Sequence, residues 1–334
     1  MSLRVGVVGL GMMGRHHARV LQSIDGIDLA GAVDPDGDRY GALRPGTPIF
    51  PSIEPLIDHG IDACVVAVPT ADHEKAALEL ATAGVHCLLE KPIAADVPAA
   101  ERIRDAFDAN GVVGAVGHIE RYNAAVQALR DRLAAGELGD VYQIATRRQG
   151  PFPNRISDVG VILDLATHDI DIVNWVTSSG YANVSARSAY RSGRDHEDLV
   201  SVVGSLGDGT VASSLVNWLS PFKERVVIVT GNAGSLVADM LTADLTLYRN
   251  ASIPTEWDRL AQFRGVAEGD MVRFAMAKPE PLVTELRSFL RYILGDGGSI
   301  VSMHEAVMTV RVAQAIRTST AEGGSLVAIR NTRG

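Results

Sequence analysis

The amino-acid sequence predicts two domains: an α/β domain with a doubly wound parallel sheet, followed by an α+β domain with an antiparallel sheet. Three observations support this. The chain has 334 residues, which is more than one domain usually holds. Apolar strand-like runs alternate with helical patterns up to residue 118, and beyond that point strand-like runs mostly follow one another directly. We therefore expect domains at residues 1–118 and 119–334.

Apolar runs of strand length recur throughout the first domain. Runs that are apolar at every position are typical of parallel strands covered by helices on both faces. Short connections and right-handed crossovers then give a doubly wound sheet. The expected strands cover residues 4–8, 29–33, 49–50, 63–68, 85–89 and 112–116. One helix is expected to follow the first strand and to end near residue 24, and two others are expected at about 72–83 and 97–110.

The second domain has a different order of elements. Turn sequences at 207–209 (Gly-Asp-Gly) and 232–234 (Asn-Ala-Gly) separate consecutive β-type runs, which indicates an antiparallel meander. The expected strands cover residues 183–190, 199–206, 211–219, 225–230, 235–239 and 245–248. Helices are expected at 123–135, 164–176, 283–294 and 304–320.

Composition limits the classes of partner. The net charge is −9 and the isoelectric point is about 5.5, which disfavours nucleic acid because phosphate binding needs a basic face. Cys64 and Cys87 both lie in apolar runs and are expected to be reduced core residues. No signal-peptide pattern is visible, and no apolar stretch approaches the roughly 20 residues of a membrane span. We expect a cytoplasmic protein with a small-molecule substrate and no membrane partner.

A glycine-rich turn follows the first strand: Gly9-Leu10-Gly11-Met12-Met13-Gly14. A G-x-G-x-x-G sequence alone is weak evidence, but here a strand precedes it and a helix follows. The first glycine allows the tight turn, the second allows close approach of a pyrophosphate, and the third allows close packing of helix on strand. The helix N-terminus then offers free N–H groups to phosphates. The pattern predicts a dinucleotide site.

Asp34 follows the second strand, where a carboxylate accepts hydrogen bonds from the adenosine ribose hydroxyls. The same carboxylate repels a 2′-phosphate, and no arginine follows it directly, so the sequence favours NAD over NADP. The alternative is an ordinary solvated aspartate in a loop. Pro69 and Thr70 end the fourth strand at the same edge of the sheet. The complete predicted cofactor set is Gly9, Gly11, Met12, Met13, Gly14, Asp34, Pro69, Thr70, His73, Glu90 and Lys91.

Two further patterns carry groups for proton transfer. Lys91 follows the fifth strand in the sequence Glu-Lys-Pro, where it would project toward a bound cofactor, although it could equally be a surface lysine before a helix. Asp164 and His168 share one face at helical spacing, so the carboxylate can orient the imidazole as a general base. A capping aspartate beside a packed histidine is the alternative. A metal site is not expected, because no second histidine lies nearby.

At this point the chain resembles the glucose–fructose oxidoreductase/inositol dehydrogenase (MocA-type) family. The segments that carry the resemblance are GLGMMGRHHA, VAVPTADHEKAALELATAGVHCLLEKPIA and LDLATHDID, and it extends over nearly the whole chain. It implies a Rossmann domain and a second domain with a large open antiparallel sheet, which often forms homodimers or homotetramers. It also implies that Lys91, Asp164 and His168 are catalytic and that the Lys91-Pro92 bond is cis. A glycine frequent in the family is Ala166 here, which is a mild departure.

The substrate is less well defined by the sequence. The segments GHIERYN and RRQGPFPNRISDVGVILDLATHDIDI resemble those of family members that oxidise position 3 of UDP-N-acetylglucosamine. Arginines can hold phosphates and an aromatic side chain can pack on a sugar. A free polyol or sugar, as in inositol dehydrogenases, is the alternative, and the arginines could also be solvated or salt-bridged. The predicted substrate residues are His118, Glu120, Arg121, Tyr122, Asn123, Arg148, Phe152 and Arg155.

These expectations combine into one mechanism. His168, oriented by Asp164, takes the hydroxyl proton while hydride leaves the same carbon, and Lys91 stabilises the negative charge on that oxygen. The roles of Lys91 and His168 could be exchanged. Because these residues come from two domains, we expect the active site in the cleft between them. Two other classes stay open: a non-catalytic NAD-binding sensor, and a lyase-type or glycoside-cleaving enzyme with tightly held NAD.

Overall fold

The structure is a computed structural model that describes residues 2–153, 159–250 and 268–330. It contains two compact units. The first comprises Met1–Ile119 together with Glu280–Arg311, and the second comprises Glu120–Pro279 together with Val312–Gly334. Within the described residues, no helix is both long enough and apolar enough to cross a membrane.

The first unit contains a six-stranded sheet in the order β3-β2-β1-β4-β5-β6, and all of its strand pairs are parallel. The strand order reverses between β1 and β4, which is where doubly wound folds bind their ligands. The predicted Rossmann fold is confirmed. The strands are β1 Leu3–Val8, β2 Ile27–Val33, β3 Ile49–Phe50, β4 Ala63–Val66, β5 His86–Glu90 and β6 Gly114–Gly117.

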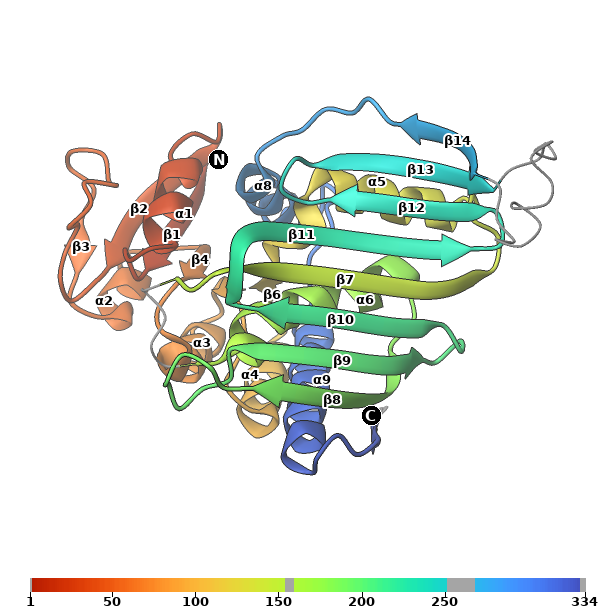
Figure 1. Ribbon diagram of the computed structural model, residues 1–334. Helices are drawn as coiled ribbons and strands as arrows, with labels where there is room; N and C mark the ends of the chain where they lie inside the picture. Colours follow the sequence, from red (N-terminus) through yellow and green to blue (C-terminus); the bar gives the residue numbers. More distant parts are fainter. Residues whose placement is uncertain (1, 154–158, 251–267, 331–334) are drawn as a thin grey trace, which may run out of the picture. The chain divides into compact units, whose positions relative to one another are not determined.

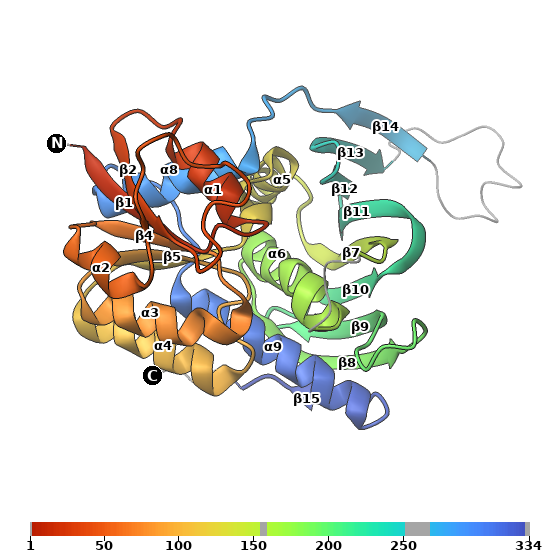
Figure 2. The same cartoon turned by 90° about the vertical axis from the view of Figure 1, so that its left-hand side faces the viewer.

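Helices cover both faces of this sheet (Figure 2). Neighbouring residues of one strand point to opposite faces, so Val7 and Val8 lie in different apolar clusters. The cluster around Val7 is closed by helices α1 and α8, and the cluster around Val8 mainly by α2, α3 and α4. These helices are α1 Gly14–Leu21, α2 Ile53–Asp58, α3 His73–Thr82, α4 Val97–Asn110 and α8 Pro281–Ile293.

The division of the chain differs from the predicted boundary at residue 118. Helix α8 belongs to the first unit, because Leu282, Leu286 and Phe289 pack in the same cluster as Leu21 of α1. These three positions repeat at the spacing of one helix face. Helix α9, Met303–Ala321, begins in the first unit and ends in the second. The residues of α8 show that one of its faces is apolar, but nothing in the local sequence tells on which of the two sheets that face packs.

The second unit contains a nine-stranded sheet in the order β14-β13-β12-β11-β7-β10-β9-β8-β15 (Figure 1). It is mostly antiparallel, which confirms the predicted large sheet, but β10 pairs with β7 in parallel. The expected single meander is therefore wrong: β7 lies between two meanders and joins them. The strands are β7 Val141–Pro151, β8 Tyr181–Ala189, β9 Leu199–Leu206, β10 Val211–Asn217, β11 Leu219–Gly231, β12 Gly234–Asp239, β13 Asp244–Asn250, β14 Glu268–Arg273 and β15 Val327–Ala328.

One face of this sheet is covered by helices α5 (Ala124–Ala134) and α6 (Thr167–Thr177), together with the last part of α9. Figure 1 shows these helices behind the sheet. Inward residues such as Ile144, Val216 and Val229 form one apolar core with them. The opposite face of the sheet is not covered by any helix among the described residues. The covered face is where the predicted catalytic pair of this unit lies, on and just before α6.

Candidate active site

The three glycines of the first turn differ in what they allow. Gly9 has a φ of +90°, and a Cβ atom there would lie 2.7 Å from the carbonyl oxygen of Ala67. A Cβ atom on Gly14 would lie 1.7 Å from the carbonyl oxygen of Gly9. At Gly11 a Cβ atom would meet nothing within 4 Å. The backbone conformation thus requires glycine at Gly9 and Gly14, while Gly11 leaves space open above the turn, as a pyrophosphate needs.

Asp34 fixes the same turn. Its Oδ2 accepts a hydrogen bond of 2.7 Å from the Leu10 N–H, and its Oδ1 accepts one of 2.9 Å from the Asp36 N–H. A carboxylate has about four lone-pair sites, so both oxygens can still accept from ribose hydroxyls. The nearby Arg39 forms an ion pair with Asp36. The positive charge of Arg39 is therefore paired with a carboxylate of its own loop.

His73 ties together two strand ends at the carboxyl edge of the sheet. Its Nδ1 lies 2.9 Å from the Pro92 oxygen and its Nε2 lies 3.0 Å from the Val68 oxygen. Burial lowers the pKa of His73 and outweighs these backbone contacts, so the ring is neutral and its one N–H donates to one of the two carbonyls. His73 thus holds the turn that carries Lys91, and the Lys91-Pro92 bond of that turn is cis, as expected from the resemblance.

Glu90 of the Glu-Lys-Pro sequence is buried beside a histidine that the sequence reasoning missed. The Nε2 of His17, on α1, lies 2.8 Å from the Glu90 Oε1, and the backbone N–H of Lys91 donates to the Glu90 Oε2 at 3.2 Å. Burial acts to raise the pKa of Glu90, but the His17 hydrogen bond and the Lys91 charge outweigh it, so this pKa lies below its ordinary value. Glu90 is therefore an anion held next to Lys91.

Glu285 is a second buried carboxyl group of the first unit. It lies on α8 with 1% exposure, and neither of its carboxyl oxygens has a hydrogen-bond partner among the described residues. Burial, reinforced by the charge of Glu90, raises the pKa of Glu285 well above its ordinary value. Its surroundings therefore favour the neutral, protonated form of the group. Sequence reasoning missed it because nothing local indicates which face of α8 is buried near Glu90.

In the second unit, Asp164 lies in a π-helical turn, Ile162–Ala166, which runs directly into α6. His168 is the second residue of α6, and both side chains are partly exposed. The sequence predicted an ordinary helix over 164–176. Single π turns are rare and occur frequently at functional sites, because they change the direction in which a side chain points. The predicted pair thus lies on one short, unusually wound segment.

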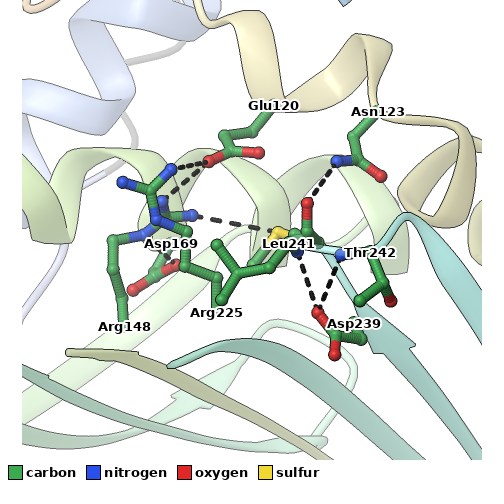
Figure 3. A network of polar contacts seen from close by, with 9 residues as sticks. Glu120, Asn123, Arg148, Asp169, Arg225, Asp239, Leu241 and Thr242 are labelled. Atoms are coloured by element: carbon green, nitrogen blue, oxygen red, sulfur yellow. Dashed lines mark hydrogen bonds and ion pairs between the residues drawn. The ribbon is translucent and has the colours of Figure 1, made fainter. Parts of the chain in front are cut away.

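The residue after His168 anchors a network of buried charges (Figure 3). Arg148, on β7, donates to the Asp169 Oδ1 at 3.0 Å and to the Glu120 Oε1 at 2.7 Å, and its side chain is only 2% exposed. Its Nη2 also lies 3.9 Å from the Met240 sulfur. Arg225, on β11, lies 3.5 Å from the same Glu120 oxygen. Each nitrogen of the Arg148 guanidinium thus has a partner inside the unit, and its role as a substrate ligand stays a prediction.

Other predicted substrate residues also make contacts within the second unit. Arg121 forms two hydrogen bonds with Asp171, at 2.8 and 2.6 Å, and both side chains are buried. Asn123 caps α5 by accepting from the Ala125 N–H at 3.0 Å. These contacts hold the start of the unit together. Their roles as substrate ligands remain predictions without support from this geometry.

The remaining predicted substrate residues are placed as follows. Phe152 packs edge-on against Trp218, with ring centroids 5.3 Å apart, and the Arg194 guanidinium lies 4.5 Å from the centre of the Phe152 ring. Tyr122 and His118 are buried, His118 at the end of the first unit. Arg155 lies outside the described residues.

In the second unit, Arg225 is a residue of the charged network that sequence reasoning missed. A signal was present, because strand residues alternate between faces and Val227 and Val229 are apolar core positions. Arg225 shares their face, so a charge falls on the covered side of the sheet. A charged residue at such a position usually has a specific role. Among the described residues, no group of three histidine, cysteine or carboxylate side chains is arranged to hold a metal ion.

The Rossmann sheet, the glycine-rich turn and the hydrogen-bonded residues at the carboxyl ends of the strands indicate a class of protein, the dinucleotide-binding oxidoreductases. Two family models match the chain. One describes an oxidoreductase family with an NAD-binding Rossmann fold and matches residues 3–118, and the other describes the GFO/IDH/MocA C-terminal domain and matches residues 126–237. The chain belongs to the GFO/IDH/MocA family of dehydrogenases, as the sequence resemblance implied.

Individual relatives agree with this assignment. The chain is 29% identical to UDP-N-acetylglucosamine 3-dehydrogenase of Acidithiobacillus ferrooxidans over 93% of this chain and 97% of the relative. It is 31% identical to inositol 2-dehydrogenase of Agrobacterium fabrum over 63% of this chain and 66% of that relative. Among solved structures, the Acidithiobacillus ferrooxidans enzyme matches with a TM-score of 0.82 at 27% identity, covering 96% of this chain and 99% of that one.

Proposed function

We propose that this protein is an NAD-dependent dehydrogenase that oxidises a secondary alcohol of a nucleotide sugar related to UDP-N-acetylglucosamine. The observation that carries the proposal is similarity over nearly the whole length of both chains to an enzyme of that name. Oxidation of inositol or a free sugar is the second candidate, because several inositol 2-dehydrogenases match about 55–65% of the chain.

The preference for NAD over NADP rests on Asp34. Its carboxylate is fixed at the end of β2 by two backbone N–H groups, and a fixed negative charge at this point repels a 2′-phosphate. A dinucleotide held by this turn would supply the hydride acceptor for the substrate carbon.

The protein's own groups handle the proton. We assign His168 as the general base for the substrate hydroxyl and Asp164 as the carboxylate that orients it. Lys91 donates a hydrogen bond to the same oxygen and stabilises negative charge there. His73 and Glu90 position Lys91. His73 fixes the turn that carries it, and Glu90 places a carboxylate beside it. Such positioned donors and bases lower the barrier only if they are in place before reaction.

Replacing Lys91 or His168 by alanine tests these roles. We expect each change to lower kcat on the true substrate by about 100-fold or more, since general acid–base catalysis contributes roughly that factor. Initial rates of NADH formation measure it. Lys75→Ala is a matched control on the exposed side of α3 and should retain the wild-type rate. A variant of Lys91 or His168 that keeps a rate near wild type contradicts the assignment of that residue.

A substrate panel decides between the two candidates. UDP-N-acetylglucosamine, other UDP-sugars, myo-inositol and free hexoses are each assayed with NAD and, in parallel, with NADP. The proposal predicts the highest kcat/KM for an N-acetylated UDP-sugar with NAD. Turnover of myo-inositol alone would establish the second candidate instead, and faster turnover with NADP would overturn the role given to Asp34.

We also propose that the uncovered face of the nine-stranded sheet forms a homodimer or homotetramer. Part of it is a hollow lined mainly by small and apolar side chains, including Ala145, Ser201, Val203, Ser213, Leu215 and Ile228, together with Arg147. Val203 is 53% exposed. A broad, weakly charged sheet face of this kind is typical of a surface that is buried by a second copy.

A further inference from the structure

Arg225 differs from its strand neighbours in exposure. It pairs in register with Arg148 across β11 and β7, so both side chains rise from the same face of the sheet. The Arg148 side chain is 2% exposed, whereas that of Arg225 is 41% exposed. Figure 3 shows the two arginines side by side beneath Glu120. One arginine is thus buried in the interior, and the other is partly exposed.

The contacts of the two arginines differ in the same way. Arg148 has two close hydrogen bonds to carboxylates, at 2.7 and 3.0 Å. Within the described part of the chain, Arg225 has one ion pair of 3.5 Å, with the Glu120 oxygen that Arg148 already binds. A guanidinium has five N–H donors in a planar fork, so most donors of Arg225 remain available to another molecule.

Arg225 also lies close to the predicted catalytic segment. Burial and the charge of Arg148 lower the pKa of Arg225, while Glu120, Asp169 and Asp164 act in the opposite direction. Asp164 is therefore near enough for its charge to act on Arg225. The hydrogen bonds agree, because Arg148, the neighbour of Arg225 in the sheet, donates to Asp169, which directly follows His168.

The charges of this cluster are balanced or negative. Two guanidinium groups, Arg148 and Arg225, face three carboxyl groups, those of Glu120, Asp164 and Asp169. Burial raises the pKa of Asp169, which moves the sum toward neutrality without making it positive. A phosphate site normally has an excess of positive charge or several free N–H groups, so this cluster is poorly suited to a phosphate. Hydroxyl groups fit it well, because each can accept from Arg225 and donate to a carboxylate.

We infer that Arg225 is a specificity-determining residue that binds hydroxyl groups of the substrate, and that the cluster around it receives an uncharged, hydroxyl-rich sugar or polyol ring. This inference rests on the proposed function, which places the substrate at Asp164 and His168. A diphosphate, where the substrate has one, binds outside this cluster.

The inference predicts a defined change in Arg225→Ala. The KM for the ring-bearing substrate should rise roughly tenfold to a hundredfold, as expected for loss of one or two charge-assisted hydrogen bonds, while kcat changes less. Arg225→Lys should recover part of the affinity, and guanidinium ions added to Arg225→Ala should recover more. Binding of UDP alone, measured as ligand-induced stabilisation of the NAD-loaded protein, should be unchanged.

The matched control is Arg147→Ala. Arg147 lies on the neighbouring strand but on the opposite, uncovered face of the sheet, and it also contacts a glutamate, Glu224. It should leave the KM at the wild-type value. Circular dichroism and the melting temperature test whether Arg225→Ala is folded. If that variant does not fold, Arg225→Lys, which can keep the ion pair with Glu120, replaces it in the measurement.

Two results would overturn the inference. One is a KM for Arg225→Ala within about twofold of wild type, together with sugar-induced stabilisation equal to wild type. The other is loss of UDP binding in that variant, which would place a phosphate at Arg225. In both cases the wild type still binds or oxidises a sugar, so the proposed function survives. A wild type that neither oxidises nor binds any sugar of the panel contradicts the proposed function, and with it the inference.

Discussion

At the scale of single residues, the first unit contains a carboxyl group that costs stability. Glu285 is buried and its carboxyl oxygens have no hydrogen-bond partner among the described residues. An unsatisfied buried polar group costs about 1–3 kcal/mol, and ionising it would cost more. The raised pKa of Glu285 is the consequence, because the protein keeps the group neutral rather than bury a second anion beside Glu90.

The pH dependence of folding tests this description. An unfolded glutamate ionises near pH 4.3, while folded Glu285 stays protonated well above that value. Because its folded pKa is raised, its contribution to stability is fully present below the unfolded pKa and is lost as the pH rises toward the folded pKa. The loss amounts to about 1.4 kcal/mol for each pH unit in that window. We expect Glu285→Gln to unfold like the wild type near pH 4 and to be increasingly more stable at higher pH.

Urea unfolding at several pH values between 4 and 9 measures the difference. The matched control is Glu54→Gln, which changes an exposed carboxylate of the same unit and should give a difference that does not grow with pH. If Glu285→Gln also shows a constant offset across this range, then Glu285 ionises normally and the neutral assignment is wrong.

At the scale of elements, a buried ion pair joins the start of the second unit to its central helix. Arg121 lies in the short turn Ile119–Tyr122, and Asp171 lies on α6. Two hydrogen bonds join their side chains, and both are at least 95% buried. The guanidinium also lies 5.6 Å from the centre of the Trp175 ring. The pair therefore fixes the chain where it enters the unit, next to Glu120.

Breaking this pair from one side should be costly. Asp171→Ala leaves the buried Arg121 charge without that carboxylate, and we expect a loss of about 3–5 kcal/mol in the free energy of unfolding. The double change Arg121→Met with Asp171→Leu should recover much of the loss, because it removes both charges. Chemical denaturation measures all three proteins. Glu74→Ala, which breaks an exposed ion pair with Arg102, is the control and should change stability little.

The elements that the sequence predicted correctly share one property, which is a pattern visible within about ten residues. The strands of the first sheet are apolar throughout, and α4 lies between the capping residue Asp96 and Gly111, which has a left-handed backbone conformation. Strand β7 was missed because Gln143, Arg147 and Gln149 face outward while Arg148 faces inward, so no apolar stretch marks it. A buried arginine is stable only with its carboxylate partners, and these lie 21 and 28 residues away in the sequence.

The same limit applies to the site. Gly9, Gly14 and Asp34 could be recognised because their roles depend on local backbone geometry. Arg121, Asn123 and Arg148 were expected to bind substrate because they are polar and close to the predicted site in sequence, yet their polar groups are satisfied inside the unit. His17, Arg225 and Glu285 were missed for the converse reason. Their significance depends on which groups the fold brings next to them.

At the scale of the whole molecule, the question is what covers the outer face of the nine-stranded sheet. Val203 lies on that face, on β9, and is paired with Ser185 of β8 and Ser213 of β10. Small side chains on both sides of an exposed valine leave the surface flat. A flat surface can approach an identical surface closely, as a twofold-symmetric interface requires.

A single charge at this position tests the proposed assembly. In Val203→Asp, a symmetric interface brings two like charges close together and buries them, so we expect the oligomer to dissociate to a species of about 35.5 kDa. Light scattering after size-exclusion chromatography measures the mass. Leu294→Asp, an equally exposed apolar residue at the end of α8, should leave the mass unchanged. If Val203→Asp keeps the wild-type mass, the copies associate through another surface. A wild type that is already monomeric would contradict the proposed assembly through this sheet face.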